Sequence, residues 1–486
     1  WIEFAERSRP QLLRLKRIVT MKTYKLLLTL LICSVGILQA QFASDAVRIA
    51  QDETGVGSRA EAMGGAYVGL ANDYSALYWN PAGLASLKKS QFYGEVTHLN
   101  FQNEVSFASQ LTDNSQSYTR LRSLGFALPL PVRRGSFVIG FGYNRVKDFD
   151  ETFGSRGTTS ESNGLEIELD GTAFDFTGQE VDQFEQIDEE GGLDQWSLGF
   201  GMKVSPNASI GVTANVITGT SDYSSTFIQE DTNNNFANRI VFVNAPPPND
   251  TTDFASYQLD RALQTDYTAL ALKVGGMVKL APGLKLGGAI GLPTTYTVNE
   301  ISAGGDIILY DDGVEDAVDF DVTEFEYDVK TPFYFDAGAS FSNRQLTFSG
   351  ALRYRDWSQT RFEVDGFELA NSDRVALEQE NDIIRENYRA TTEVHFGGEI
   401  KAPRGRSAVR VGYSLIPDPR KDMPDEFNKQ FITLGLGFAV DRNVRMDLTY
   451  KRGEWEQESL GELSSETAFE KIQTNRFAIG LTYNFR

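Results

Sequence analysis

The sequence is poor in residues that carry metal or redox chemistry, with one cysteine, Cys33, and two histidines, His98 and His395, among 486 residues. A single cysteine excludes a disulfide-stapled scaffold and the zinc modules built on cysteine pairs. Basic residues number 46 against 67 acidic ones, and the net charge is −21. A nucleic-acid binder needs a basic footprint, so this balance argues against one. We therefore expect no cofactor, no metal site and no nucleic-acid partner.

Long hydrophobic runs are also missing. Beyond residue 40, no stretch approaches the 18 consecutive apolar residues of a transmembrane helix. The hydrophobic content of 41% is too low for a bundle of membrane helices. It is ordinary for a membrane β-barrel, because the strands of such a barrel are apolar on one face only.

The start of the chain reads as processing information rather than fold. Residues 1–20 begin with Trp1 and contain no Met, which indicates upstream sequence translated in error. Residues 21–40 open at Met21 with two lysines, continue with about 13 apolar residues and end at Ala40. This three-part form predicts a secretory signal peptide cleaved after Ala40. The alternative, an N-terminal membrane anchor, is disfavoured because the apolar part is too short to span a bilayer.

Apolar and small or polar residues alternate with a period of two from about residue 92 onward. Near the C-terminus, Phe477, Ile479 and Leu481 alternate with Ala478 and Gly480. Such alternation is the signature of a β-strand with one apolar face. Fourteen segments show it: 92–109, 119–130, 136–149, 194–204, 208–220, 265–280, 284–299, 327–341, 345–357, 388–400, 407–416, 429–440, 443–453 and 472–485.

The connections between these segments alternate in length. Six are tight and rich in turn residues, such as Arg134-Gly135, Ala281-Pro282-Gly283 and Asp441-Arg442-Asn443, and the seven between them are longer. Short turns at one end and long loops at the other are typical of an outer-membrane barrel. A soluble sandwich or propeller is the alternative, but a propeller should show a repeat of 40–50 residues, and none is found. We predict an all-β fold, a transmembrane antiparallel barrel of about 14 strands over residues 91–486.

The long connections are acidic. Residues 148–194 contain 15 Asp or Glu and one Arg, and residues 300–326 contain ten carboxylates and no basic residue. Carboxylates could bind divalent cations, but no complete calcium-binding loop occurs. Solvated surface loops are the favoured interpretation.

Residues 41–90 do not alternate. Small residues dominate the run from Gly55 to Asn72-Asp73, and the following stretch contains Tyr74, Tyr78, Trp79 and the turn signal Asn80-Pro81. A compact segment ahead of a barrel is suited to folding inside it as a plug. A periplasmic linker, the alternative, would be more polar and less aromatic.

This segment resembles the N-terminal hatch of the FadL/TodX-type outer-membrane transporters of hydrophobic compounds. The resemblance rests on the run from Gly57 to Asn80-Pro81-Ala82, with weaker support from residues 353–358 and 402–417. It implies a 14-stranded barrel plugged by residues 41–90. It also implies a hatch motif, which consists of Gly64, Gly65, Asn72, Asp73, Asn80, Pro81 and Ala82. Three hatch residues are candidates for lining the ligand channel: Met63, Tyr78 and Trp79.

By resemblance, the protein is expected in the bacterial outer membrane, in contact with its lipid and lipopolysaccharide. There it would take up long-chain fatty acids or other hydrophobic compounds by passive diffusion past the hatch, with Asn80 holding the hatch turn. A second interpretation on the same fold resembles the PorV-type barrels of type IX secretion, whose partners are secreted proteins. A barrel enzyme would need a serine near a histidine, and no G-x-S-x-G motif occurs. We therefore expect no catalysis.

Overall fold

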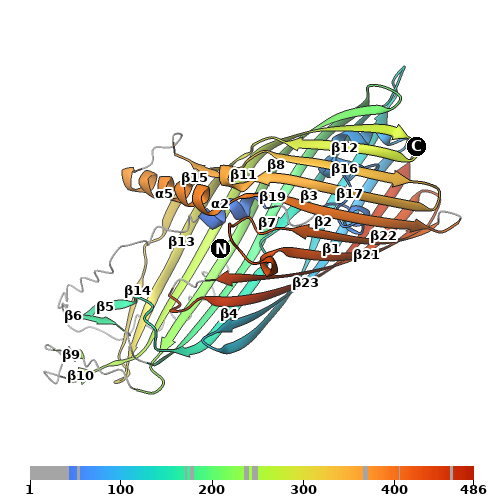
Figure 1. Cartoon of the computed structure of the whole chain (residues 1–486). Coiled ribbons are helices and arrows are strands. Elements are labelled where there is room, and N and C mark those ends of the chain that lie inside the picture. Colours follow the sequence, from blue (N-terminus) through green and yellow to red (C-terminus); the bar gives the residue numbers. More distant parts are fainter. Residues whose placement is uncertain are drawn as a thin grey trace, which may run out of the picture.

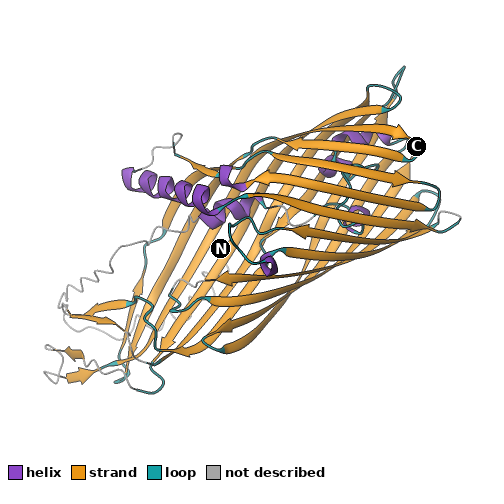
Figure 2. Ribbon diagram, in the orientation of Figure 1, coloured by secondary structure: helices purple, strands orange, loops and turns teal. Residues whose placement is uncertain are grey.

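The protein is described by a computed structural model that covers residues 43–51, 55–169, 172–175, 180–234, 240–242, 250–364, 370–403, 406–459 and 463–485. Residues 1–40, including the expected signal peptide, lie outside the described residues. The described chain forms a closed antiparallel β-barrel, tall and inclined in Figures 1 and 2. Short turns gather at the end marked C, and long loops gather at the opposite end.

Fourteen strands make the wall among the described residues, which confirms the predicted number. Each pairs with its sequence neighbour, and the first strand pairs with the last from Ser90↔Phe485 onward, which closes the cylinder. The wall strands are β1 (Ser90–Phe107), β2 (Gln110–Leu130), β3 (Phe137–Asp148), β7 (Val181–Lys203), β8 (Ala208–Glu230), β11 (Phe254–Ala281), β12 (Leu284–Gly291), β16 (Tyr334–Ser342), β17 (Leu346–Asp356), β19 (Ala390–Lys401), β20 (Ser407–Ile416), β21 (Lys429–Ala439), β22 (Val444–Ser459) and β23 (Ala468–Phe485).

Further elements extend the wall on the long-loop side. Strands that continue or border wall strands are β4 (Glu151–Thr159), β13 (Thr295–Tyr310), β14 (Glu315–Asp319), β15 (Thr323–Lys330) and β18 (Arg361–Glu363). Two hairpins project from the loops, β5 (Glu166–Leu169) with β6 (Thr172–Asp175), and β9 (Ile240–Phe242) with β10 (Asp250–Thr252). The loops also contain the 3-10 helices η3 (Trp357–Gln359) and η4 (Asp425–Phe427) and the helix α5 (Asn371–Asn387).

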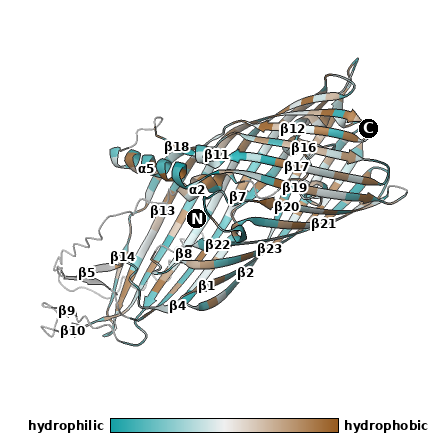
Figure 3. Cartoon of the chain, viewed as in Figure 1, coloured by the Kyte–Doolittle hydropathy of each residue, from teal (hydrophilic) through white to brown (hydrophobic). Residues whose placement is uncertain are grey.

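The alternation read from the sequence separates an outer from an inner face. On β23, Phe477, Ile479 and Leu481 are about half exposed, whereas Ala478 between them is 3% exposed. The same alternation of hydrophobic and hydrophilic residues follows strand after strand in Figure 3. The exposed apolar face is the one expected to meet lipid. No helix among the described residues is long and apolar enough to cross a membrane.

The strands continue further toward the long loops than the sequence predicted. β7 begins at Val181 rather than near 194, and β8 ends at Glu230 rather than near 220. One predicted loop, 110–118, is wrong: β1 and β2 meet at a two-residue turn, in which Ala108 and Ser109 have φ of 45° and 63°. Positive φ at both central residues is the geometry of a tight hairpin turn. Beyond the apolar belt the outward side chains are polar, so the period of two fades although the backbone pairing continues.

The described residues 43–51 and 55–89 lie inside the cylinder, and we call this N-terminal segment the hatch. It forms the helices α2 (Ala43–Ala50), α3 (Ser58–Glu61) and α4 (Ala76–Trp79) and the 3-10 helix η2 (Pro81–Ser86), joined by irregular segments. Nearly every side chain from Gly55 to Ala85 is buried. α2 lies toward the long loops, and the chain then runs to the short-turn end and enters β1.

Candidate functional site

The inner wall is shaped to admit the hatch backbone at close range. A Cβ atom at Gly412 of β20 would lie 2.1 Å from the amide nitrogen of Gly64. A Cβ at Gly211 of β8 would lie 2.3 Å from the carbonyl carbon of Pro81. Any larger residue at these positions would displace the hatch. The small residues on the second face of the strands therefore make room for the hatch.

Wall side chains donate hydrogen bonds to hatch carbonyl groups. Irregular backbone buried in the lumen leaves carbonyl oxygens that need donors. Hydroxyl groups supply several, among them Thr449 to the oxygen of Ser58 at 2.6 Å and Ser340 to that of Gly69 at 2.8 Å. The Lys273 ammonium donates to the oxygen of Tyr78 at 2.5 Å. The hatch is thus held by its backbone to β11 and β16, which are separated by β12 alone, and to β22 on another side of the barrel.

A buried chain of charges ties α3 to the wall. Arg59 binds both carboxylate oxygens of Glu399 on β19 at 3.2 Å. Arg410 on β20 binds Glu399 at 2.8 Å and Asp447 on β22 at 2.8 Å, and both Glu399 and Arg410 have fully buried side chains. Lys401 approaches Glu399 to 3.2 Å. Arg59 is the only hatch member of this group, so it links the hatch to a network that the wall completes without it.

Arg59 also contacts Asn72 and Asp73, two residues of the hatch motif. Its guanidinium donates to the Asn72 side-chain oxygen at 2.7 Å and lies 3.7 Å from Asp73. The Tyr67 hydroxyl donates to Asp73 at 2.5 Å. Burial, and the neighbouring Asp73 carboxylate, raise the pKa of Tyr67 well above its usual value, so this hydroxyl keeps its proton and remains a donor. Asn72 and Asp73 therefore share one hydrogen-bonded cluster with Arg59.

Asn80, Pro81 and Ala82 of the hatch motif form a turn, in which the Asn80 side chain is fully buried. The Asn80 Oδ1 accepts from the Ala82 amide at 3.1 Å, and Nδ2 donates to the carbonyls of Val68 at 3.0 Å and Gly276 at 3.1 Å. Pro81 begins η2, where its missing N–H costs nothing. Asn80 thus joins two parts of the hatch and β11 through one side chain.

Gly64 and Gly65 take backbone conformations that suit glycine, with φ of +64° and +74°. A Cβ at Gly64 would lie 2.6 Å from the carbonyl oxygen of Phe396, so both the conformation and the space require glycine. The Gly64 carbonyl lies 2.9 Å from Nδ1 of His395 on β19. One of the two histidines therefore contacts the hatch.

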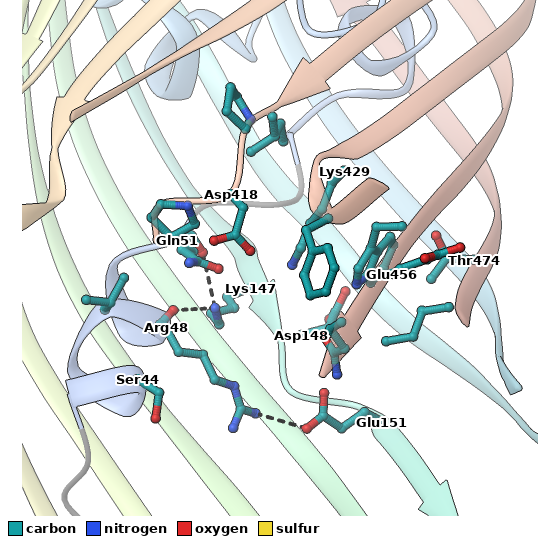
Figure 4. A pocket seen from close by; sticks show the side chains of 18 of the residues that line it. Ser44, Arg48, Gln51, Lys147, Asp148, Glu151, Asp418, Lys429, Glu456 and Thr474 are labelled. Carbon is teal, nitrogen blue, oxygen red and sulfur yellow. Dashed lines mark hydrogen bonds and ion pairs between the residues drawn. The ribbon is translucent and has the colours of Figure 1, made fainter. Parts of the chain in front are cut away.

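A cavity of about 440 Å³ lies on the long-loop side of the hatch. It is bounded by α2, the junction of β3 and β4, the segment 416–431 and the strands β22 and β23. Figure 4 shows charged and polar side chains from these elements pointing toward a common space. Aromatic and aliphatic side chains complete the lining, among them Leu99, Phe101, Phe149, Phe431, Trp455 and Ile472. A volume of 300–1,000 Å³ is typical of small-molecule sites.

Cations hold the hatch end of this cavity in place. The Lys147 ammonium donates to the carbonyl oxygens of Arg48 at 2.5 Å and Gln51 at 3.2 Å, the last turn of α2 and its exit (Figure 4). Arg48 pairs with Glu189 at 2.5 Å and lies 3.8 Å from Glu151. On the opposite wall, the Lys451 ammonium lies 4.3 Å from the centre of the Phe431 ring. The cavity therefore combines apolar surface with charges of both signs, from six basic and seven acidic side chains.

Two smaller cavities lie deeper, around the hatch. One of about 40 Å³ is lined by Glu61, Tyr78 and Trp79 of the hatch and by β17 and β19, and one of about 60 Å³ is lined by Leu77, Tyr78 and mostly apolar wall residues. Tyr78 and Trp79, expected in a channel, thus border cavities. Met63 borders none of the three and packs instead against the wall at Gly397.

Within the described residues, His98 contacts the Thr119 hydroxyl, and His395 contacts the Gly64 carbonyl and Glu393. Neither imidazole is hydrogen-bonded to a serine there. The described part of the chain also contains no group of three or more His, Cys, Asp or Glu side chains that could hold a metal ion.

Several residues of this site had not been predicted from the sequence. The sequence assigns no site role to Arg48, Lys147 or Glu399, and it places Arg59 and Arg410 only within the runs that carry the family resemblance. In the sequence, such a residue is marked by a charge at an inward-facing position of an alternating strand, as Arg410 is next to the outward-facing Val411. Its partner, however, lies on another strand, which no local pattern reveals.

The fold and its filled lumen define a class: a 14-stranded transmembrane barrel with an internal N-terminal segment. No protein-family model matches the sequence, and no curated protein matches it either. Three solved structures that match most of the chain share 14% identity with it. The toluene transporter TodX of Pseudomonas putida matches over 89% of this chain and 99% of its own, with a TM-score of 0.53. A Pseudomonas aeruginosa FadL homologue matches over 87% of this chain and 98% of its own (TM-score 0.52), and the toluene transporter TbuX of Ralstonia pickettii over 89% and 99% (TM-score 0.50). The chain therefore has the fold of the FadL-type channels, which confirms the resemblance read from the hatch. Of these structures, TodX and TbuX are described as toluene transporters.

Proposed function

We propose that the protein carries hydrophobic small molecules passively across the outer membrane through its lumen, with the hatch as the gate. The observation that carries this proposal is the cavity of about 440 Å³ between α2 and the wall. It lies on the long-loop side, which faces the cell exterior in barrels of this kind. The likeness in fold to TodX and TbuX, both described as toluene transporters, supports the same class of cargo.

The lining suits a molecule with an apolar body. Burial in an apolar site is worth about 25 cal/mol per Å² of ligand surface, whereas a water-filled pore offers no such gain. The Lys451 ammonium against Phe431, and that of Lys429 at 4.8 Å from the Trp455 ring centre, add positive charge beside aromatic surface. This combination supports long-chain fatty acids as the cargo, with the carboxylate near the lysines and the chain along the aromatic side chains.

Transport requires the hatch or the wall to move. Below the cavity, the hatch fills the lumen, and the two deeper cavities of about 40 and 60 Å³ are too small for such a cargo. Tyr78 borders both of them, so a displacement of α4 would join them. We infer that opening begins with the segment Ala76–Pro81 and leaves the ladder of the wall intact.

Uptake of a fluorescent long-chain fatty acid into liposomes containing the purified protein tests this function. Thr474 borders the cavity on the inner face of β23, and Thr474→Trp should fill part of it and lower binding and uptake at least about tenfold, as expected for loss of a well-packed pocket. Phe477→Trp is the matched control, because Phe477 lies on the same strand, 52% exposed on the outer face. Uptake that is equal in both variants, with both still folded, would contradict the proposal.

Purification without added ligand supplies a second readout. A hydrophobic compound found by lipid extraction of the purified barrel would support transport. Co-purification with secreted proteins, and no uptake by the wild type, would favour the PorV-like alternative instead.

A further inference from the structure

Positive charge collects at the short-turn end of a protein that is otherwise strongly acidic. The short turns and the residues beside them carry an exposed cation on every hairpin, and Asp441 is the single acidic residue in these turns. The turn residues are Arg133, Arg134, Arg344, Arg406 and Arg442. They lie at the end marked C in Figure 1, opposite the acidic loops. We call these arginines, with the lysines named below, the basic collar.

Within the described residues, none of the five turn arginines forms an ion pair, and all five are exposed. Three lysines near the short turns also lie close to one another, which adds to the excess of positive charge at this end. Lys279 and Lys285 face each other directly in the register of β11 and β12, and Lys203 is close enough to act on Lys285 electrostatically. Like charges directly opposite in a sheet destabilise it. The described residues therefore supply no ion-pair partner to the collar arginines, so their positive charge is free to bind anions from the surroundings.

The collar lies at the edge of the lipid-facing belt. Val132 precedes Arg133, Phe341 precedes Arg344 by three residues, and Val440 precedes Arg442 by two. These apolar side chains are 46%, 44% and 63% exposed on the outer face. Long basic side chains at such positions reach the level of the lipid headgroups while their stems stay against apolar surface.

The distribution around the barrel identifies the kind of partner. The collar arginines lie on four of the six hairpins at this end, β2–β3, β16–β17, β19–β20 and β21–β22, whereas Lys203, Lys279 and Lys285 occupy inner-face positions on the other two. In the strand order β2–β3 lies almost opposite β16–β17, so the outer-edge charge is not confined to one side of the cylinder. A docked protein would cover one side, whereas a lipid leaflet surrounds the whole circumference. Clusters of Lys and Arg beside a membrane segment attract anionic headgroups.

We propose that the basic collar binds the phosphate groups of anionic phospholipids in the leaflet at the short-turn end. Short turns face the periplasm in outer-membrane barrels, so this leaflet is the inner, phospholipid one. The binding would fix the depth and direction of the barrel in the membrane. It does not depend on which molecule crosses the lumen.

Native mass spectrometry of the folded protein, released from vesicles of phosphatidylethanolamine and phosphatidylglycerol, tests this binding. The wild type should retain phosphatidylglycerol several-fold above its share in the vesicle. The variant Arg134→Glu/Arg344→Glu/Arg442→Glu should retain the two lipids in the vesicle ratio. In about 0.5 M NaCl, where the screening length falls to about 4 Å, the wild type should lose much of its preference.

The matched control is Arg156→Glu/Arg374→Glu/Arg385→Glu, which changes the net charge equally at the long-loop end. It should keep the preference, and all variants should show the heat-modifiable gel migration of a folded barrel. No enrichment in the wild type, or an equal loss in the control, would overturn the proposal. Retention of lipopolysaccharide in place of phosphatidylglycerol from a mixed vesicle would overturn it as well, because that lipid belongs to the other leaflet.

Discussion

Asn80 is the residue on which the hatch turn depends most directly. Its amide makes three hydrogen bonds, to Ala82, Val68 and Gly276, in a fully buried position. Asn80→Ala should therefore destabilise the closed hatch by about 1–2 kcal/mol, comparable to the loss of a helix cap or a buried hydrogen bond. Leakage of small hydrophilic antibiotics into cells that express the variant should rise, while the barrel remains heat-modifiable.

The control for this prediction is Asn343→Ala. The Asn343 side chain accepts from the amides of Gln345 and Leu346 in an exposed hairpin turn, with the same chemistry but no contact with the hatch. Its leakage should equal that of the wild type. Equal leakage in all three proteins would show that the Asn80 turn does not control closure.

Arg59 and Arg410 bind the same carboxylate from different sides, and their removal should have different results. In Arg59→Met, Glu399 keeps Arg410 and Lys401 as partners, so the wall stays neutralised and only the hatch loses an anchor. In Arg410→Met, Glu399 keeps Arg59 and Lys401. Asp447 keeps Arg445, but the wall loses the fully buried cation that links β19, β20 and β22. The upper limit of this loss is about 3–5 kcal/mol, the cost of leaving a buried charge without its partner.

We therefore expect Arg59→Met to raise solute leakage with little change in thermal unfolding. Arg410→Met should lower the temperature at which the barrel loses its fast gel migration. The two measurements on both variants check this assignment. A lower unfolding temperature in Arg59→Met than in Arg410→Met would reverse the roles given to the two arginines.

Within the single strand β21, neighbouring residues face opposite sides of the wall, so one contacts the hatch and the next faces outward. Leu434 and Leu436 are 52% and 43% exposed on the outer face, whereas a Cβ at Gly435 would lie 2.4 Å from the Ala62 side chain. Arg at Leu434 or Leu436 should destabilise the barrel by about 2–4 kcal/mol if the position lies near the bilayer midplane. Arg at Gly435 should instead displace the hatch and cause leakage. Unfolding in denaturant and leakage measure the two effects, and tolerance of Arg at both leucines would show that the assigned register is wrong.

The strands were predictable where lipid imposes a rule and unpredictable where it does not. In the belt, one face must be apolar, so the period of two marked β21 and β23 clearly. The upper part of β8, with Ser221, Ser224 and Gln229, is polar on both faces and gives no such period. Helix α5 was missed for a similar reason, because only Leu377 and Ile384 of its 17 residues are buried.

The site was predictable only in its local part. The Asn80-Pro81 turn is a short-range feature, since its bonds to Ala82 and Val68 span 2 and 12 residues. The Arg59–Glu399 pair spans 340 residues, and only the closed barrel brings the two side chains together. A sequence without aligned relatives shows that both residues are charged but not that they meet.

For the whole molecule, charge is arranged along the axis of the barrel. Carboxylates dominate the long loops, and cations surround the short turns. Between them, the lumen holds compensated pairs such as Arg410 with Asp447. The two ends therefore face different surroundings, and the proposed direction of transport, from long loops to short turns, follows the same axis.

The relation between hatch and wall gives the last prediction. The ladder of the wall closes through β1 and β23 without any hatch strand, so its backbone hydrogen bonds do not require residues 43–89. The hatch contributes donors, acceptors and packing to the lumen, and water can replace the polar contacts. Deleting residues 43–89 should therefore leave a barrel that inserts, shows fast unboiled gel migration and leaks small hydrophilic solutes.

The deletion also exposes inner charges that the hatch now covers. Arg122 donates to the Gly55 carbonyl and pairs with Asp148, and it keeps the second partner when the first is removed. Arg410 likewise keeps Glu399 and Asp447. Since these charges remain paired within the wall, hydration of the lumen should not disrupt it. Failure of the deleted chain to assemble would mean that the hatch is a core for barrel folding, and assembly without leakage would mean that other segments close the lumen.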